Sequence, residues 1–446
     1  MTSRAPIFGA PSPRVQLWGL GLALAALTAI GPMVHLRLGG WAYFAMFLAA
    51  AGGIALSQRL AQRLTSRDAV IAILATAVFM RLALLFVDPY LSTDIYRYIW
   101  DGRVQAAGIN PYRYLPSAPE LAALRDAAIY PNINRADYAP TIYPPVAQAF
   151  FLAVTRLGES VVVMKLGLIA CEAGLVAALV ALLGILRLPR TRVAIYAWHP
   201  LSIWEVAGNG HVDVAMATLM MIGLLLYAKD RLLPAGVLVT LGALVKPTAL
   251  LALPVFWRPW NWRLPAIVGI TALVTYVPYL SVGRRVFGFL RGYVEEEGFG
   301  SGRGFNALWL LERVAGPVPG ATLLYVALAA MVMIGAALAV GFRRDRTLET
   351  ALACLSWLLV TFLILASPHY PWYFLAIVPV LVLHGSVAGW VLSIGCVAIY
   401  GSVEGAGWPD YDIRIALFTA ATIAAVLCDA RRTLRASAVA SLGVVR

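Results

Sequence analysis

The stretch DAVIAILATAVFMRLALLFV, residues 68–87, decides the fold class of this protein. An apolar run of this length crosses the roughly 30 Å hydrocarbon core of a bilayer as one helix. Similar runs recur along the chain, in which 61% of the 446 residues are hydrophobic and 13% are charged. Because a backbone that crosses lipid must satisfy its own hydrogen bonds, we expect an all-α polytopic membrane protein. The runs predict about 11–13 transmembrane helices in a single integral-membrane domain over residues 1–446.

Basic residues orient these helices across the membrane. RLAQRLTSR, which precedes residues 68–87, carries Arg59, Arg63 and Arg67, and the positive-inside rule places such a connection in the cytoplasm. The next segment, residues 88–142, then lies outside. It is the longest polar segment of the chain, and long ordered loops in compact proteins are usually functional.

Arginine clusters nearer the C-terminus extend this orientation. The clusters within 343–346 and 431–435 are expected inside by the same rule. Counting spans between them predicts three further outer segments, at 284–318, 367–373 and 403–412.

The middle of the chain allows two topologies. If RLPRTR (187–192) is cytoplasmic, then NGHVD (209–213) lies outside only when residues 143–157 do not fully span. The same count requires residues 232–256 to form a broken hairpin or a re-entrant pair, and a Lys-Pro step in that segment favours such a break. In the alternative count both regions take their other topology, and NGHVD lies inside.

Charge and cysteine content exclude two classes of function. The net charge of +13 comes from short basic clusters between apolar runs, which the membrane orientation explains, so we expect no nucleic acid partner. The four cysteines lie within apolar segments without metal-ligand spacing. We therefore expect the cysteines to be small core residues. No cofactor is expected, with a divalent cation as a minority alternative.

The outer segment 88–142 begins with DPYLSTDIYRYIWDGRVQAAGINPYRYLP. A Ser-Thr pair caps a predicted helix that starts at Asp94, where the helix terminus favours an ionised carboxylate. Asp94, Arg97 and Asp101 fall near one face of this helix, and aromatic residues line another. The pattern is typical of an amphipathic helix on the membrane surface, and equally of acids presented to an outer site.

The strings STDIYRYIWDGRVQAAGINPYRYLP (92–116) and YPP (143–145) resemble the first extracytoplasmic loop of the GT-C superfamily of glycosyltransferases. They are most similar to the bacterial polyprenol-phosphate-mannose-dependent mannosyltransferases, which are like glycosyltransferase family 87. The resemblance spans most of the chain, with the first loop as its most specific part. It implies helices around a cavity open to lipid and to the outer face, with Asp94 as catalytic base. Weaker matching pieces follow in the same order: HPLSIWEVAGNGHVD (199–213), VKPTALLALP (245–254) and PHYPWYF (368–374).

The chemistry of such a transfer agrees with a carboxylate in this loop. An acceptor hydroxyl becomes a good nucleophile when a positioned base such as Asp94 takes its proton. A departing lipid phosphate needs cations or hydrogen-bond donors more than a proton. The cationic candidates are Arg97, Arg103, Lys246, Arg303, His211 and His369, and the other substrate-binding candidates are Asp101, Tyr143, Asp213 and Tyr370.

Some of these side chains have structural interpretations as well. For Asp101 we favour a structural ion pair with Arg97 or Arg103 over a direct role in the reaction. His211 and Asp213 fit a polar helix cap, substrate contacts or, together with Asp94, a divalent-cation site as a minority alternative. His369 fits either substrate contact or an aromatic belt at the membrane surface.

Charged residues elsewhere also allow more than one role. Lys246 lies in an otherwise apolar run, where a charge is either functional or extends to the membrane interface. Arg303 belongs to a Gly-rich outer loop that would close over a substrate. Lys165 and Glu172 fall on one helix and are expected to pair, and the three glutamates at 295–297 are expected to be a solvated run.

Together these observations predict an inverting glycosyltransferase in the bacterial inner membrane, with several membrane passes and a site that faces the periplasm or cell exterior. It would move a hexose, mannose by resemblance, from a polyprenyl-phosphate carrier to a lipid, glycan or protein hydroxyl. Its partners would be the donor, the acceptor and membrane lipids. The alternatives are a transporter or lipid-carrier flippase, an enzyme that uses a diphosphate-linked donor, and, least favoured, a membrane scaffold.

Overall fold

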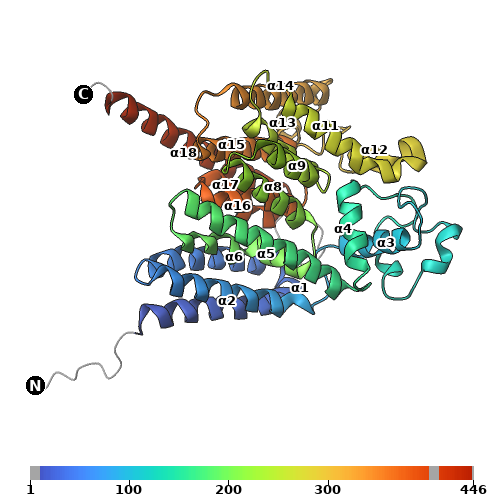
Figure 1. The fold of residues 1–446 in the computed structure, drawn as a ribbon, viewed down its shortest axis with the longest axis horizontal. Coiled ribbons are helices and arrows are strands. Elements are labelled where there is room, and N and C mark those ends of the chain that lie inside the picture. Colours follow the sequence, from blue (N-terminus) through green and yellow to red (C-terminus); the bar gives the residue numbers. More distant parts are fainter. Residues whose placement is uncertain (1–10, 401–410, 444–446) are drawn as a thin grey trace, which may run out of the picture.

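A computed structural model describes residues 11–400 and 411–443 of the chain. Within these residues the protein consists of helices and connecting loops without strands (Figure 1), so the all-α prediction is confirmed. The helices α3 (Asp94–Ala106) and α4 (Pro145–Thr155) lie at one end of the molecule. The last turns of α18 (Tyr411–Gly443) lie at the opposite end (Figure 1). Most of the predicted outer segment 403–412 lies outside the described residues.

Seven helices of the described chain are long and apolar enough to cross a membrane. The prediction of 11–13 spans also counted shorter apolar segments, which are too short to cross a bilayer as single straight helices. The seven are α1 (Pro13–Ala61), α2 (Ser66–Leu85), α5 (Val161–Ile185), the continuous segment Arg263–Glu296, α14 (Ala321–Phe342), α15 (Leu348–Ala366) and the Ile413–Arg435 part of α18 (Tyr411–Gly443).

The helix α1 is a hairpin rather than one rod. Gly39 has a φ of 77° inside it, a conformation that glycine adopts without strain, and the chain reverses there. The two halves pack so closely that a Cβ on Gly53 would lie 2.9 Å from the Leu24 side chain. The halves correspond to the first two predicted spans, and α2, capped by Thr65, corresponds to the third.

Shorter helices fill the space between the long ones. Two cavity-facing helices are α3 (Asp94–Ala106) and α12 (Leu290–Glu296). The other short apolar elements are α4 (Pro145–Thr155), α8 (Asp213–Tyr227), α9 (Leu232–Ala243), η5 with α10 (Pro247–Phe256), η7 with α16 (Pro371–Leu383) and α17 with η8 (Val387–Ile399). The remaining elements are η1 (Pro119–Leu124), η2 (Tyr130–Asn132), η3 (Arg190–Val193), α6 (Ala194–Ala197), α7 (Pro200–Ser202), η4 (Ile203–Gly208), α11 (Arg263–Tyr276), η6 (Val277–Phe287) and α13 (Asn306–Ala315).

The segment NGHVD lies at the same end of the molecule as the first loop. The side-chain oxygen of Asn209 accepts hydrogen bonds from the backbone N–H groups of Tyr90 (3.1 Å) and Leu91 (2.9 Å), directly after α2. The helix α4 has only 11 residues, or about 16 Å at 1.5 Å per residue, which is too short to span a bilayer. This arrangement matches the first of the two predicted topologies.

Residues 232–256 form the broken hairpin that this topology requires. Tyr227, just before α9, donates to the carbonyl of Arg346, and the carbonyl of Val255, at the end of α10, accepts from Arg343. Both ends of the hairpin therefore lie beside the 343–346 arginine cluster. The turn between its arms, at Lys246, lies at the other end.

The helix α3 is not an ordinary surface helix. It packs along α4, and the side chains of Ile95, Tyr98, Ile99 and Trp100 are at most 1% exposed. Later residues of the first loop also contact this helix, since the Trp100 ring lies 5.6 Å from that of Tyr130. The helix is thus built into the protein rather than laid on the membrane.

The predicted pair between Lys165 and Glu172 is wrong. Glu172 forms a bidentate ion pair with Arg81 on α2, at 2.8 and 3.0 Å. Lys165 instead donates to the carbonyls of Leu84 (3.2 Å) and Val87 (2.6 Å), at and just beyond the end of α2. Both contacts tie α5 to α2, and both are structural.

Candidate active site

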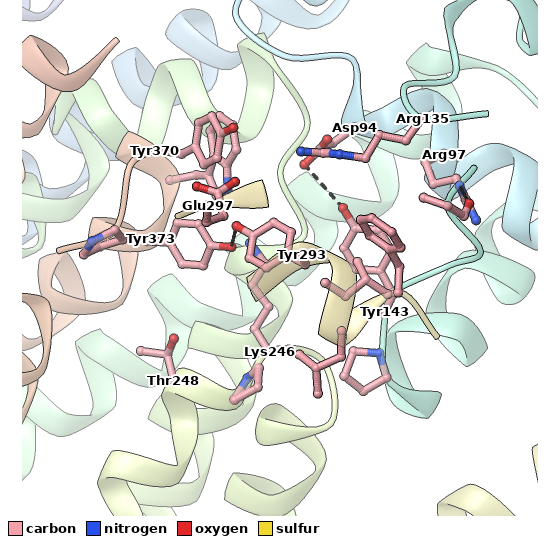
Figure 2. A pocket seen from close by; sticks show the side chains of 18 of the residues that line it. Asp94, Arg97, Arg135, Tyr143, Lys246, Thr248, Tyr293, Glu297, Tyr370 and Tyr373 are labelled. Carbon is pink, nitrogen blue, oxygen red and sulfur yellow. Dashed lines mark hydrogen bonds between the residues drawn. The ribbon is translucent and has the colours of Figure 1, made fainter. Parts of the chain in front are cut away.

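A cavity of about 620 Å³ lies at the end of the molecule that carries the first loop. Its walls come from segments far apart in the sequence: the start of α3, loop residues 134–144, the hairpin turn at Lys246, the α12 region and the turn 368–373 (Figure 2). The polar side chains that line it include Asp94, Asn134, Arg135, Tyr143, Lys246, Glu297, His369 and Tyr370.

Asp94 is half-buried in the wall of this cavity, in the first turn of α3. Its backbone N–H donates to the hydroxyl of Ser92 (3.2 Å), while the N-cap residue Thr93 makes no side-chain cap hydrogen bond. The amide of Asn134 donates to one carboxylate oxygen (2.8 Å), and the hydroxyl of Tyr143 donates to the other (3.3 Å; Figure 2). An ionised carboxylate accepts about four hydrogen bonds, so Asp94 keeps acceptor capacity for a ligand.

Arg135 brings a cation close to this carboxylate (Figure 2). Its Nε donates to Glu296 at 2.7 Å, and its backbone has a φ of 55°, which is uncommon for a residue with a side chain. The carboxylates of Glu296 and Asp94 both raise the pKa of Arg135, against the effect of burial. Sequence reasoning missed Arg135 and Asn134. The only signal in the sequence is that they are polar residues in the segment NINRAD (132–137).

Lys246 supplies a second cation on the cavity wall, at the turn of the 232–256 hairpin. Its ammonium contacts both carboxylate oxygens of Asp213, at 2.7 and 2.9 Å, and lies 4.5 Å from the centre of the Tyr373 ring. Asp213 is fully buried and does not line the cavity. Its observed contact is with the lysine, which it holds in place.

The segment around α12 forms one side of the cavity and is fastened to the other sides by polar contacts. Glu296 accepts from Arg135 and from the hydroxyl of Tyr138, each at 2.7 Å. Tyr293 shares a hydrogen bond with Tyr373 at 2.7 Å. Within the three-glutamate run, Glu295 and Glu296 are exposed as predicted, although Glu296 is paired, and the prediction is wrong for Glu297, which is buried.

His369 fastens the same segment from the turn after α15. Its Nδ1 lies 2.8 Å from a carboxylate oxygen of Glu297, and its Nε2 lies 3.0 Å from the carbonyl of Gly304. Both partners are acceptors, and a ring that donates from both nitrogens is an imidazolium. Burial alone would lower the pKa of His369, but the hydrogen bond and charge of Glu297 outweigh it and raise this pKa above its ordinary value.

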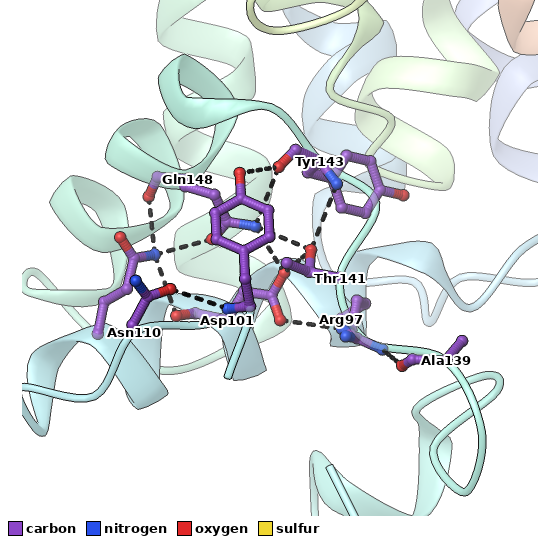
Figure 3. Close-up of polar contacts among 9 residues, drawn as sticks. Arg97, Asp101, Asn110, Ala139, Thr141, Tyr143 and Gln148 are labelled. Atoms are coloured by element: carbon purple, nitrogen blue, oxygen red, sulfur yellow. Dashed lines mark hydrogen bonds and ion pairs between the residues drawn. The ribbon is translucent and has the colours of Figure 1, made fainter. Parts of the chain in front are cut away.

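Arg97 and Asp101 form a structural network one to two turns along α3 from Asp94 (Figure 3). Asp101 is 1% exposed and accepts from Arg97 Nε (2.9 Å), Thr141 (2.5 Å) and Gln148 (2.9 Å). Arg97 also donates to the carbonyl of Ala139 at 3.0 Å and touches the cavity wall. The network holds residues 139–143 against α3 and thereby places Tyr143 beside Asp94.

Three other predicted site residues do not line the cavity. Arg103 forms ion pairs with Asp126 and Glu159, each at 2.7 Å, and the hydrogen bond from this arginine lowers the pKa of Asp126 to about 2. Arg303 is exposed on the Gly-rich loop. His211 is fully buried, with its Nδ1 2.8 Å from Glu205.

The side chains named as a divalent-cation alternative are not gathered around one point. Lys246 occupies both oxygens of Asp213, and His211 faces Glu205. Over residues 11–400 and 411–443, no group of three or more His, Cys, Asp or Glu side chains is arranged to hold a metal ion.

Comparison with known proteins relates the part of the chain that contains Asp94 to a known family. A family model described as alpha-(1->6)-mannopyranosyltransferase, N-terminal domain, matches residues 17–261. The chain is 29% identical over 198 residues to alpha-(1->6)-mannopyranosyltransferase A of Mycobacterium tuberculosis, covering 42% of this chain and 36% of the relative. It is 27% identical over 194 residues to the protein of the same name from Corynebacterium glutamicum, covering 41% and 38%. The matched part is thus well under half of either relative, and no solved structure matches.

Proposed function

Since the chain belongs to the alpha-(1->6)-mannopyranosyltransferase N-terminal-domain family, we propose that it transfers a mannosyl group from a polyprenyl phosphate to an acceptor hydroxyl. The acceptor would be a lipid, a glycan or a protein. The observation that carries the proposal is Asp94, a carboxylate with spare acceptor capacity that lines a cavity of about 620 Å³ together with Arg135 and Lys246.

In the proposed reaction Asp94 is the general base. It takes the proton of the acceptor hydroxyl while that oxygen attacks the anomeric carbon of the sugar. The new C–O bond forms as the bond from the anomeric carbon to the phosphate oxygen breaks, and the lipid phosphate leaves with the bonding electrons. One displacement of this kind inverts the anomeric configuration, so a β-linked donor gives an α-mannoside.

The two cations suit the departing phosphate. Arg135 presents a guanidinium of which Glu296 takes the Nε donor, and the planar group is well matched to phosphate oxygens. Lys246 presents a point charge on the opposite side of Tyr293 (Figure 2). Charge at such positions stabilises the negative charge that develops on the leaving group.

The apolar part of the cavity suits the lipid chain of the donor. Ile142, Val286, Phe287 and Leu290 line it, and Phe287 and Leu290 are 62% and 53% exposed. The lining therefore includes well-exposed apolar side chains from η6 and α12. By the positive-inside rule this end faces the outside of the bacterial inner membrane.

A transfer assay tests the proposal. Purified protein in lipid is incubated with radiolabelled polyprenyl phosphate mannose and a membrane extract, beside a polyprenyl diphosphate sugar and a nucleotide sugar as control donors. We expect a mannosylated product from the monophosphate donor alone, and none with Asp94→Asn. Product from only a control donor would contradict the proposed donor, and solute flux without any glycosidic product would favour a transporter.

A further inference from the structure

Three aromatic rings form a continuous stack between the buried interior and the cavity. The ring of His211 lies 4.0 Å from that of Trp372, with 20° between their planes. Tyr370 lies on Trp372 at 4.5 Å and 6°. His211 is fully buried, Trp372 is 6% exposed, and Tyr370 is the more exposed member, on the cavity wall.

The buried end of the stack is fixed by the NGHVD segment and the π-helical turn η4. His211 contacts the Glu205 side chain through its Nδ1 (2.8 Å), and its backbone N–H donates to the Glu205 carbonyl (2.8 Å). The hydroxyl of Tyr400 donates to the other carboxylate oxygen of Glu205. Gly210 has a φ of 76° and lies so close to Ile95 that a Cβ would be 2.3 Å from that side chain. His211 is therefore positioned from its buried side by its backbone hydrogen bond and by the contact with Glu205, without touching the cavity.

The cavity end of the stack meets the reactive part of the site. Tyr370 lies beside Glu297 and near Asp94 and Arg135 (Figure 2). Burial, together with the charge of Glu297, raises the pKa of its hydroxyl to about 12, so the ring stays a neutral phenol at ordinary pH. A flat ring next to carboxylates suits a pyranose, which offers C–H groups on a ring face and hydroxyls at the rim.

We propose that Tyr370 is a stacking platform for a pyranose ring of the substrate, and that His211 is a positioning residue that fixes this platform through Trp372. The inference rests on the proposed function, because it assigns the sugar a place within the same cavity. It gives the NGHVD segment a role that does not require His211 to touch the substrate. The ring that occupies the platform belongs either to the donor or to a saccharide acceptor.

Binding measurements test this without turnover. The probes are a short-chain polyprenyl phosphate, the same lipid carrying mannose, and free mannobiose, each titrated calorimetrically into the full protein in detergent. Tyr370→Leu is compared with Tyr370→Phe, which keeps the ring face. We expect Tyr370→Leu to raise the Kd of one mannose-containing probe about fivefold and to leave the sugar-free lipid unchanged, while Tyr370→Phe binds all probes as the wild type does.

The affected probe identifies the source of the sugar. Weaker binding of the mannosyl lipid assigns the platform to the donor, and weaker binding of mannobiose assigns it to an acceptor. For His211→Gln we expect the same selective loss, whereas a merely structural role would weaken the sugar-free lipid as much.

Two results would overturn the inference: unchanged binding of both sugar probes by Tyr370→Leu, or an equal loss for the sugar-free lipid. A selective loss in a protein that transfers no mannose would leave the platform standing and refute the reaction instead.

Discussion

Asp94 and Asp101 lie on the same helix, two turns apart, and have opposite surroundings. Asp101 is 1% exposed and accepts hydrogen bonds from Arg97, Thr141 and Gln148. Asp94 is half-buried, accepts from one amide and one hydroxyl, and lines a cavity. A carboxylate that is enclosed by the protein and bound by three donors holds structure, whereas one with spare acceptor capacity at a cavity is able to accept a substrate proton. Helical periodicity alone assigned both acids to one face and did not separate these roles.

The arginines near the two acids differ in the same way. Arg97 is 5% exposed and is bound by Asp101 and the carbonyl of Ala139. Arg135 reaches the cavity beside Asp94 and is fastened by Glu296, itself only partly buried. The contrast separates the first turn of α3, where Asp94 lines the cavity, from the turns after it, where Asp101 is enclosed against Thr141 and Gln148.

The largest expected effect separates the two acids by activity. Asp94→Asn keeps the size of the side chain and removes the base, so we expect the rate of mannosyl transfer to fall by about 10²–10⁴-fold, with little change in melting temperature. Single-turnover rates and thermal denaturation in detergent are the measurements. An Asp94→Asn protein with wild-type turnover would contradict the base assignment.

Asp101→Asn should show the reverse pattern. It leaves the buried charge of Arg97 without its ion partner, which costs about 3–5 kcal/mol in the free energy of unfolding. We expect a large drop in thermal stability and near-normal turnover in the fraction that stays folded. The loss should be smaller in an Arg97→Met background, because the unpaired charge is then absent. A stable Asp101→Asn protein without activity would contradict the structural role assigned to Asp101.

The hydrogen bonds to Asp94 give a smaller test of the same contrast. Asn134→Ala and Tyr143→Phe each remove one donor to the carboxylate. A hydrogen bond to a charged group is worth about 1.5 kcal/mol at the lower end, so we expect about a tenfold fall in kcat for each. A change confined to KM would show that these groups bind substrate instead.

The smallest expected effect concerns pH and the α12 side of the cavity. The pKa of His369 is raised above its ordinary 6.5, so the stabilisation from its clamp on Glu297 is complete below pH 6.5 and is lost as pH rises through the raised pKa. The protection of residues 298–304 against hydrogen exchange, relative to the intrinsic exchange rate at each pH, should therefore fall with rising pH. We expect Glu297→Gln to remove this pH dependence. Glu295→Gln should keep it, because the Arg291–Glu295 pair is largely exposed.

Much of the architecture could be predicted from local sequence. Apolar runs identify the long helices, the YPP sequence starts α4, and the Lys-Pro step breaks the 232–256 hairpin. The 403–412 loop stays a prediction, since most of it lies outside the described residues. Asn134, Arg135 and Glu296 could not be predicted as site residues, because their partners lie 40 to 161 residues away.

The sequence by itself determined that the chain is a helical membrane protein and which loop is rich in chemistry, because apolar length and turn residues act over a few neighbours. Only the tertiary structure decided that Asp94 lines a cavity while Asp101 is enclosed, and that Lys246 meets Asp213. The physical reason is that the number of free lone pairs on a carboxylate depends on which distant segments fold against it. That number is a property of packing and cannot be read from the order of the residues around it.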